Sequence, residues 1–326
     1  MRPTLSVVLP VFNERETLDR LLARLVPVLE RATDGSFEAL FVDDGSDDGS
    51  SELLDGFHAR DSRAKVIHFS RNFGHQAALQ AGLDAARGAA VILMDADLQD
   101  PPELLERFVA RWREGYEVVY AVRRRRKETT VKRLAYALFY RTLKAMAEID
   151  VPLEAGDFCL LDRRVVDALV ALPERNRFLR GLRSWVGFRQ VGVEYERDAR
   201  FAGESKYTLR KLVRLALSGY VGFSAMPLRA ATWLGFGAAL TGFGIALWAV
   251  VTKLLDVPSP RGWASTLAVV LFVGGVQLIM LGVLGEYVGR VYDEVRRRPL
   301  YVVQARVGLD DETTREHDVE RRAVRG

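Results

Sequence analysis

The stretch AAVILMDADLQDPP, residues 89–102, joins an apolar run to a cluster of carboxylates. Residues 89–94 carry no polar side chain, which predicts a buried β-strand. The predicted strand stops at Asp95-Ala96-Asp97. Two carboxylates at this spacing can hold a divalent cation beside diphosphate oxygens, and hard oxygen ligands suit Mg²⁺ or Mn²⁺. The cation would offset the charge that develops on a diphosphate leaving group.

Upstream of this stretch, apolar runs alternate with segments of helical periodicity. We predict strands at residues 5–9, 37–42 and 65–69, and helices at residues 16–31, 50–60 and 74–87. This alternation is typical of an α/β domain with a mostly parallel sheet and helices on both faces. In such sheets, ligands bind beyond the carboxyl ends of the strands.

Polar clusters follow the four predicted strands, at residues 10–14, 43–47, 71–76 and 95–100. Because carboxyl ends of parallel strands share one edge, these clusters should meet there. Asp43 or Asp44 would accept hydrogen bonds from a base or ribose, although the run Asp-Asp-Gly-Ser is also ordinary turn chemistry. The sequence contains neither the dinucleotide-binding glycine fingerprint after the first strand nor a P-loop lysine motif.

Residues 229–292 are overwhelmingly apolar. Residues 230–252 and 262–285 contain no charged side chain, and each run is long enough for a transmembrane helix. The short linker contains two prolines and predicts a helical hairpin. Basic residues flank the pair at Arg229, Arg290 and residues 296–298, so the positive-inside rule places both ends in the cytoplasm. We therefore expect a protein of the inner cell membrane with two spans.

These features divide the chain into five parts. We expect a cytosolic domain at residues 1–204, a basic amphipathic juxtamembrane helix at 205–228, two spans within 229–292, a cytosolic segment at 293–309 with a short strand at 301–307, and a disordered tail at 310–326. A further basic amphipathic helix is predicted at 129–147. The single cysteine, Cys159, excludes an intrachain disulfide, and we expect it to be a small buried side chain. The N-terminus lacks the pattern of a secretory signal peptide.

A set of ordered motifs resembles a known family. The runs VVLPVFNE, VDDGSDD, RNFGHQAAL and DADLQDPPE are similar to family 2 glycosyltransferases, which have a single-domain nucleotide-sugar fold. The runs GDFCLLDRRVVDAL, NRFLRGLRSWVGF and FAGESKYTLRKL resemble the polyprenyl-phosphate branch, which contains dolichol-phosphate mannose synthases and bactoprenol glucosyltransferases. The two spans match the bactoprenol arrangement. The resemblance covers residues 5–303 and implies inverting transfer of a hexose, from UDP-glucose first or GDP-mannose second, to polyprenyl (undecaprenyl) phosphate in the cell envelope.

The resemblance also implies roles for individual residues. The nucleotide-sugar pocket would comprise Pro10, Val11, Asn13, Glu14, Asp43, Asp44, Arg71, His75 and Asp95. The metal and diphosphate would lie beside Asp95 and Asp97, with Gln99 as a further candidate ligand. The catalytic residues would be Asp97 and Asp157, the latter facing the donor sugar and the acceptor. The acceptor phosphate would contact Arg123, Arg133 and Lys206.

Several of these residues have a second interpretation. Asn13 could cap the following helix, His75 could be a structural histidine, and Arg133 could be part of a solvated helix face. A phosphate monoester carries close to two negative charges at neutral pH, so the acceptor is already a nucleophile. We therefore expect Asp157 to orient substrate and not to act as an obligatory base.

Two other functions stay open as alternatives. A processive polysaccharide synthase would carry a Gln-x-x-Arg-Trp motif, whereas residues 180–185 read RGLRSW. A catalytically silent membrane scaffold would have no need of intact Asp95, Asp97 and Asp157. The expected partners are a nucleotide sugar, a polyprenyl phosphate and the membrane, and no nucleic acid. Glycines and alanines in the spans allow packing within one chain or in a homo-oligomer.

Overall fold

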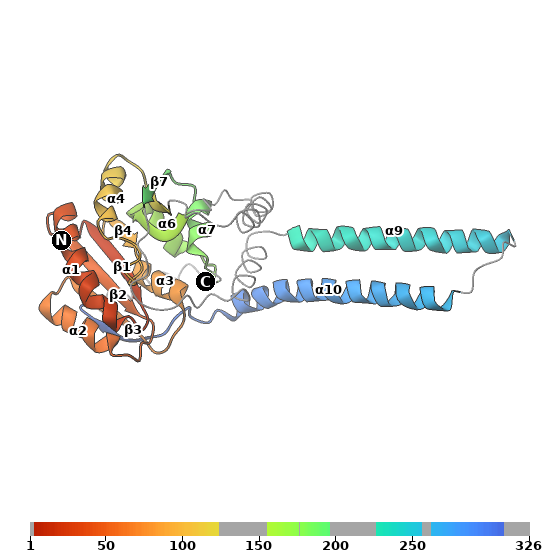
Figure 1. The fold of residues 1–326 in the computed structure, drawn as a ribbon, viewed down its shortest axis with the longest axis horizontal. Coiled ribbons are helices and arrows are strands. Elements are labelled where there is room, and N and C mark those ends of the chain that lie inside the picture. The colour runs from red at the N-terminus through yellow and green to blue at the C-terminus, as the bar shows by residue number, and fades with distance from the viewer. Residues whose placement is uncertain (1–2, 124–154, 176, 196–225, 256–261, 310–326) are drawn as a thin grey trace. The chain divides into compact units, whose positions relative to one another are not determined.

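The computed structural model describes residues 3–123, 155–175, 177–195, 226–255 and 262–309. The described residues form an α/β unit and a helical unit, and the segment after residue 297 belongs to the α/β unit (Figure 1). The predicted amphipathic helix at 129–147 and most of the one at 205–228 lie outside the described residues, as does the tail from residue 310.

The elements alternate along the chain as predicted. In chain order they are β1 (Leu5–Val11), α1 (Arg15–Thr33), β2 (Phe37–Asp43), α2 (Ser50–Arg60), β3 (Ala64–Phe69), α3 (His75–Ala85), β4 (Ala90–Leu93), α4 (Leu104–Arg113), β5 (Val118–Arg123), β6 (Ala155–Asp162), α6 (Arg163–Ala171), α7 (Leu179–Trp185), β7 (Gln190–Tyr195), α9 (Met226–Leu254), α10 (Trp263–Arg296) and β8 (Val303–Val307).

One mixed sheet organises the α/β unit. The strand order is β7-β5-β6-β4-β1-β2-β3-β8. β3, β2, β1 and β4 are parallel, whereas β6 runs antiparallel to both β4 and β5, and β8 runs antiparallel to β3. The predicted α/β class with a mostly parallel sheet is confirmed.

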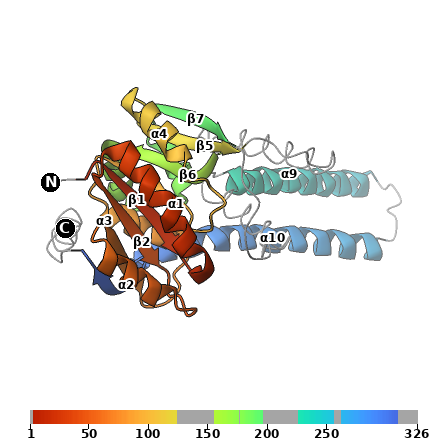
Figure 2. The same ribbon diagram turned by 60° about the vertical axis from the view of Figure 1, so that its left-hand side comes forward.

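Helices cover both faces of this sheet (Figure 2). Contacts place α1, α2 and α4 together on one face, and α3 packs with α6 on the other. Every residue of β1 and β2 is therefore buried, which explains their continuous apolar character. α1 inserts leucines at helical spacing into the larger core cluster, among them Leu18, Leu21, Leu25 and Leu29.

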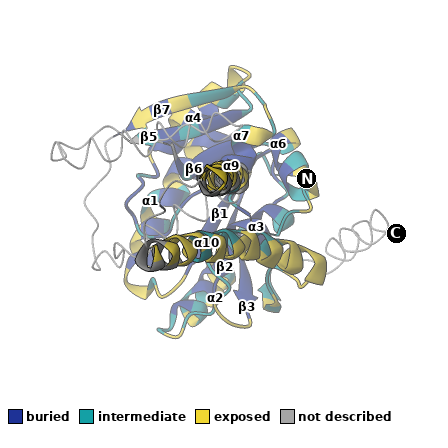
Figure 3. Ribbon diagram, turned by 90° about the vertical axis from the view of Figure 1, so that its right-hand side faces the viewer, coloured by how far each residue is buried: buried dark blue, intermediate teal, exposed yellow. Residues whose placement is uncertain are grey.

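α9 and α10 form an antiparallel hairpin whose helices lie side by side in Figures 1 and 2. Most of their described side chains are exposed, including large apolar ones such as Trp233, Phe236 and Leu278 (Figure 3). Gly235 lies at the contact between the helices, where a Cβ would stand 3.8 Å from Met280. Exposed apolar surface of this kind is what a lipid environment covers.

Within the described residues, one segment, Phe272–Arg296, is long and apolar enough to cross a membrane. The apolar part of α9, Gly235–Ile245, is shorter by the same criterion. The helical hairpin thus agrees with the sequence prediction, while the number of spans stays a prediction.

Candidate active site

The sheet topology brings distant residues to one edge. The carboxyl ends of β1, β2, β3 and β4 coincide because these strands are parallel. β6 runs the other way along β4, with Cys159 opposite Leu93. Continuing this antiparallel register by two residues sets Asp157, near the start of β6, opposite Asp95, just after β4. The predicted convergence of strand-end residues is therefore a consequence of strand direction and register.

The turn after β2 is bonded to the loop that precedes α3. The carboxylate of Asp44 is buried and accepts hydrogen bonds from the backbone of Phe73 at 2.6 Å and Gly74 at 2.9 Å. Gly45 has φ +72°, and a Cβ at this position would stand 2.7 Å from the carbonyl carbon of Arg71. The turn and the loop are thus in direct backbone contact, which only glycine permits here.

Asp43 is also committed to bonds within the protein. It accepts hydrogen bonds from Ser46 N at 3.0 Å and Ser51 Oγ at 2.6 Å, and its Oδ2 lies 2.9 Å from His68 Nδ1. Burial opposes its ionisation, but hydrogen bonds from His68, Ser46 and Ser51 lower the pKa of Asp43 to about 2. A contact of either aspartate with a base or ribose stays a prediction. Their visible role is to fix the turn after β2 to neighbouring parts of the protein.

Asn13 joins the turns after β1 and β2. Its Nδ2 donates to Asp47 Oδ1 at 2.7 Å, and its Oδ1 accepts from Asp47 N at 3.0 Å. Its backbone N–H donates to Ser46 Oγ, and its own φ is +57°. Glu14 is the N-cap residue of α1 and its own side chain makes no capping hydrogen bond, while Asp48 Oδ2 accepts from Arg15 N at 3.1 Å. Asn13 therefore does not cap α1, and instead links the turns after β1 and β2 through hydrogen bonds.

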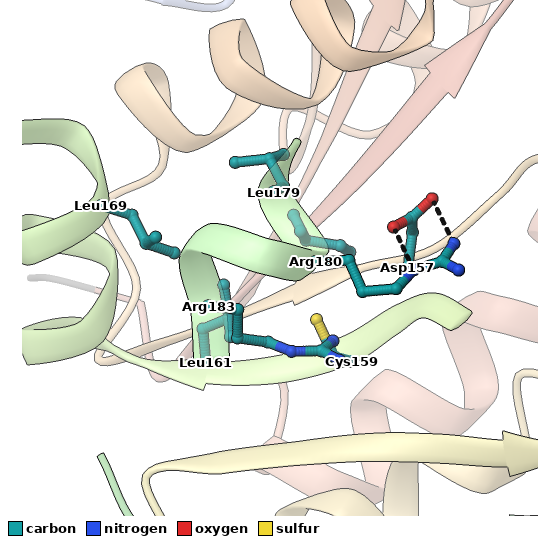
Figure 4. A pocket seen from close by; sticks show the side chains of 8 residues that line it. Asp157, Cys159, Leu161, Leu169, Leu179, Arg180 and Arg183 are labelled. Atoms are coloured by element: carbon teal, nitrogen blue, oxygen red, sulfur yellow. Dashed lines mark hydrogen bonds and ion pairs between the residues drawn. The ribbon is translucent and has the colours of Figure 1, made fainter. Parts of the chain in front are cut away.

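Four titratable side chains meet where β4 ends and β6 begins. His75, the first residue of α3, has its Nε2 3.6 Å from Asp95 Oδ1 and 3.9 Å from Asp157 Oδ2. Arg180 on α7 also approaches Asp157, with Nη2 3.2 Å from Oδ2 and Nε 3.4 Å from Oδ1 (Figure 4). All four side chains keep between 22% and 42% of their surface exposed, so a ligand can reach them. His75 is thus not a buried structural histidine.

Several carboxylates lie around Asp95, and their negative charge favours a bound cation. Partial burial raises the pKa of Asp95 to about 6, an effect that His75 opposes and that Asp97, Asp100 and Asp157 reinforce. A divalent cation beside Asp95 and Asp97 would relieve this repulsion. Within the described residues, no three His, Cys, Asp or Glu side chains form a metal-binding group. The two carboxylates therefore fit a cation that completes its coordination with substrate phosphates and water, as Mg²⁺ commonly does.

The loop after β4 is held in an unusual conformation. Leu98 has φ +58°, which costs a residue with a Cβ about 1–2 kcal/mol. Its side chain is 8% exposed and belongs to the core, so burial offsets that cost. Asp97 Oδ1 accepts from Gln99 N at 3.0 Å, and Tyr195 OH donates to the buried Asp100. Gln99 is buried too, and its proposed role as a metal ligand stays a prediction.

A second arginine lies one helical turn after Arg180. Arg183 is 2% exposed, and its guanidinium lies 5.1 Å from the centre of the Tyr120 ring. Its Nη1 donates to Gly156 O at 3.4 Å, while its Nε and Nη2 have no hydrogen-bond partner among the described residues. A small, mainly apolar pocket beneath the site is lined by Leu93, Asp157, Cys159, Leu161, Leu169, Leu179, Arg180 and Arg183 (Figure 4). Cys159 is buried as predicted, and burial raises the pKa of its thiol.

The described structure does not test the residues that were predicted to contact the acceptor phosphate. Arg123 is the last residue of β5, at the same sheet edge, but its side chain is outside the described structure, as are Arg133 and Lys206 entirely. Pro10 and Val11 end the buried strand β1 at the edge, and Arg71 is exposed with its guanidinium 4.2 Å from the Phe73 ring centre.

Arg180 is the residue that sequence reasoning missed. It lies in the run RGLRSW, from which no site role for Arg180 is predicted. The spacing of Arg180 and Arg183 on one face of a short helix is the signal that could have found it.

Residues 6–170 match the family model of glycosyl transferase family 2. The chain is a family 2 glycosyltransferase. Residues 226–291 of this glycosyltransferase match the GtrB C-terminal hairpin, in agreement with the hairpin of α9 and α10. The family resemblance inferred from the motifs is thereby confirmed.

Relatives match this glycosyltransferase over most of its length. It is 48% identical to the uncharacterized glycosyltransferase YkcC of Bacillus subtilis, over 94% of this chain and 95% of that protein. It is 46% identical to the uncharacterized glycosyltransferase sll0501 of Synechocystis, over 94% and 96% of the two chains. It is 39% identical to the bactoprenol glucosyl transferase of Shigella phage SfX, over 92% and 99%.

Proposed function

We propose that this glycosyltransferase transfers glucose from UDP-glucose to a polyprenyl phosphate, with inversion at the anomeric carbon. The observation that carries the proposal is the cluster of His75, Asp95, Asp157 and Arg180 at the strand edge, in a chain that is 39% identical over nearly the whole length of a bactoprenol glucosyl transferase. The membrane hairpin supports a lipid acceptor, because it keeps the α/β unit tethered where such a lipid is found.

The chemistry needs positioning more than it needs a strong base. An oxygen of the acceptor phosphate attacks the anomeric carbon, and the bond from that carbon to the donor diphosphate breaks. The leaving nucleoside diphosphate keeps the electron pair. The attacking phosphate is already ionised at neutral pH, so no proton has to be removed from it. In-line attack of this kind inverts the configuration of the carbon.

The residues at the edge have distinct proposed roles. Asp95 and Asp97 would hold Mg²⁺ or Mn²⁺, which supplies charge stabilisation to the departing diphosphate when bound. Asp157 orients the sugar or the acceptor, and Arg180 fixes the carboxylate of Asp157 through an ion pair. Asn13, Asp43 and Asp44 fix the loops that form the nucleotide pocket. Arg123, Arg133 and Lys206 are the proposed contacts of the acceptor phosphate.

The proposed topology has two spans with both ends in the cytoplasm. The apolar segments of α9 and α10 would cross the inner membrane as a hairpin, and flanking arginines would stay on the cytoplasmic side. The donor and the lipid phosphate would then meet on that side.

A transfer assay with the detergent-solubilised full chain tests this function. Undecaprenyl phosphate is incubated with radiolabelled nucleotide sugars, and lipid-linked product is counted. We expect product with UDP-glucose and its loss with EDTA. Product with GDP-mannose in its place would assign the other donor. Long polymer formed without lipid acceptor would support a processive synthase, and absence of product with every donor would support a silent scaffold.

A further inference from the structure

The chain returns to the α/β unit after the hairpin. Residues 301–309, here called the C-terminal strap, include β8, which pairs antiparallel with β3 in a register that sets Val303 opposite Phe69. One residue before β8, Val302 O accepts a hydrogen bond from Ser70 N at 3.0 Å. The strap therefore pairs with β3 up to the point where the loop toward α3 begins.

Tyr301 contacts the strand that precedes the loop and the helix that follows it. Its ring stacks on Phe69 at the end of β3, with centroids 5.0 Å apart and planes 13° from parallel. Its hydroxyl donates to Asp84 Oδ2 on α3 at 2.8 Å. Phe69 in turn meets the edge of Phe73 in the loop, with centroids 5.7 Å apart. Offset-stacked and edge-to-face arrangements of this kind are favourable for aromatic pairs.

The loop held in this way, residues 70–74, presents part of the candidate site. It carries Arg71 and leads directly into His75, whose ring faces Asp95. On its opposite side, the loop is bonded to Asp44. The loop therefore lies between two fixed partners, namely the turn after β2 and the strap.

We propose that Tyr301 is a positioning residue of the nucleotide-sugar site, which holds the loop of residues 70–74 so that Arg71 and His75 face the donor. This inference rests on the proposed function for the identity of the ligand. It gives the strap a role beyond protecting β3 as an edge strand. It also means that the segment completing the donor site follows the membrane hairpin in the chain.

Three full-length variants separate this role from simple stabilisation. Tyr301→Ala removes the stack and the hydroxyl, Tyr301→Phe keeps the stack, and Gln304→Ala changes an exposed residue of β8 as the matched control. For Tyr301→Ala we expect the KM for UDP-glucose and the Kd for UDP to rise about tenfold, because small displacements of positioning groups weaken the site. The KM for undecaprenyl phosphate should stay within about twofold. Tyr301→Phe should stay within about threefold of wild type in every constant, since it loses one hydrogen bond only.

Two readouts do not depend on turnover. Hydrogen exchange of the amides in residues 70–74 should accelerate in Tyr301→Ala and not in Gln304→Ala. In addition, Tyr301→Ala and Arg71→Ala should be strongly non-additive in the Kd for UDP, because both act through one loop. A purely structural role would lower Tm while leaving the donor KM and this coupling unchanged.

The outcomes distinguish the inference from the function beneath it. If wild type forms no lipid-linked sugar, the proposed function fails. If wild type is active and Tyr301→Ala retains its donor KM, UDP affinity and loop protection, the function stands and the role of Tyr301 is refuted. If the KM for donor and the KM for acceptor rise equally in Tyr301→Ala, the substitution affects the whole protein and not the donor site. The inference is then likewise refuted.

Discussion

At the residue scale, the contact between Arg180 and Asp157 joins side chains from α7 and β6 at the candidate catalytic centre. Arg180 approaches both carboxylate oxygens, a two-point geometry that lysine lacks. The pair is partly exposed, so its contribution to stability is small, about 0–1 kcal/mol. We therefore expect the pair to matter for the orientation of the Asp157 carboxylate more than for stability.

We predict that Arg180→Ala lowers kcat by about a hundredfold, because Asp157 loses the partner that orients it. Arg180→Lys should restore part of that loss through charge alone. Arg164→Ala is the matched control, since Arg164 is an exposed arginine that pairs with Glu117 and Asp162 near the opposite end of β6. Steady-state transfer rates measure the effect. Turnover of Arg180→Ala at the wild-type level would show that the pair is incidental.

His68 links pH to stability at a second cluster. Its two ring nitrogens lie 2.9 Å from Asp43 Oδ2 and 3.0 Å from Asp55 Oδ1, and a ring donates to both only when protonated. The hydrogen bond with Asp43 raises the pKa of His68 above its ordinary 6.5, although burial opposes this. Its contribution to stability is thus full below pH 6.5 and is lost as the pH rises through the raised pKa.

We therefore expect His68→Gln to lower Tm most below pH 6.5 and least at alkaline pH. Thermal unfolding of both proteins across a pH series measures the difference. A gap in Tm that stays constant, or widens with rising pH, would show that His68 is neutral in the folded protein.

At the scale of elements, the approach of α3 to the sheet depends on one glycine. A Cβ on Gly82 would stand 2.1 Å from Val8 Cγ1 in β1, which is far inside van der Waals contact. His75 is the first residue of α3, so the packing of α3 on β1 also positions His75 in the candidate site. Gly56 in α2 is a helical glycine with open space around its missing Cβ.

Replacement by alanine should have opposite effects on stability at the two glycines. Gly82→Ala should destabilise the protein by about 1–3 kcal/mol through overpacking. Gly56→Ala should stabilise it by about 0.5–1 kcal/mol through helix propensity. Thermal or denaturant unfolding measures both. A Gly82→Ala protein as stable as wild type would mean that α3 moves freely on the sheet.

The sequence predicted elements well where periodicity is local. The prediction of residues 50–60 as a helix coincides with α2, and the strands before Asp43 and Asp95 end where predicted to within a residue or two. Contacts between distant elements carry no such periodic signal. The pairing of Phe69 with Val303 and the ion pair of Asp157 with Arg180 each depend on three-dimensional packing. Neither the strap's partner strand nor the role of Arg180 was therefore predicted.

At the scale of the whole molecule, one chain combines a family 2 glycosyltransferase domain with an apolar hairpin. At the edge of the sheet, burial and, to a smaller extent, neighbouring carboxylates raise the pKa of Asp95. The hairpin offers an apolar surface suited to lipid. The strap follows α10 in the chain, and its strand β8 pairs with β3. These features fit an enzyme that joins a soluble nucleotide sugar to a lipid phosphate.

We propose that Asp95 and Asp97 act through a divalent cation in sugar transfer to that lipid. The direct measurement is transfer from radiolabelled UDP-glucose to undecaprenyl phosphate by EDTA-treated protein, titrated with Mg²⁺ or Mn²⁺. Wild type and the surface control Asp19→Asn should regain activity with added cation, and Asp95→Asn should not. Full transfer in EDTA, or wild-type activity in Asp95→Asn, would contradict the claim.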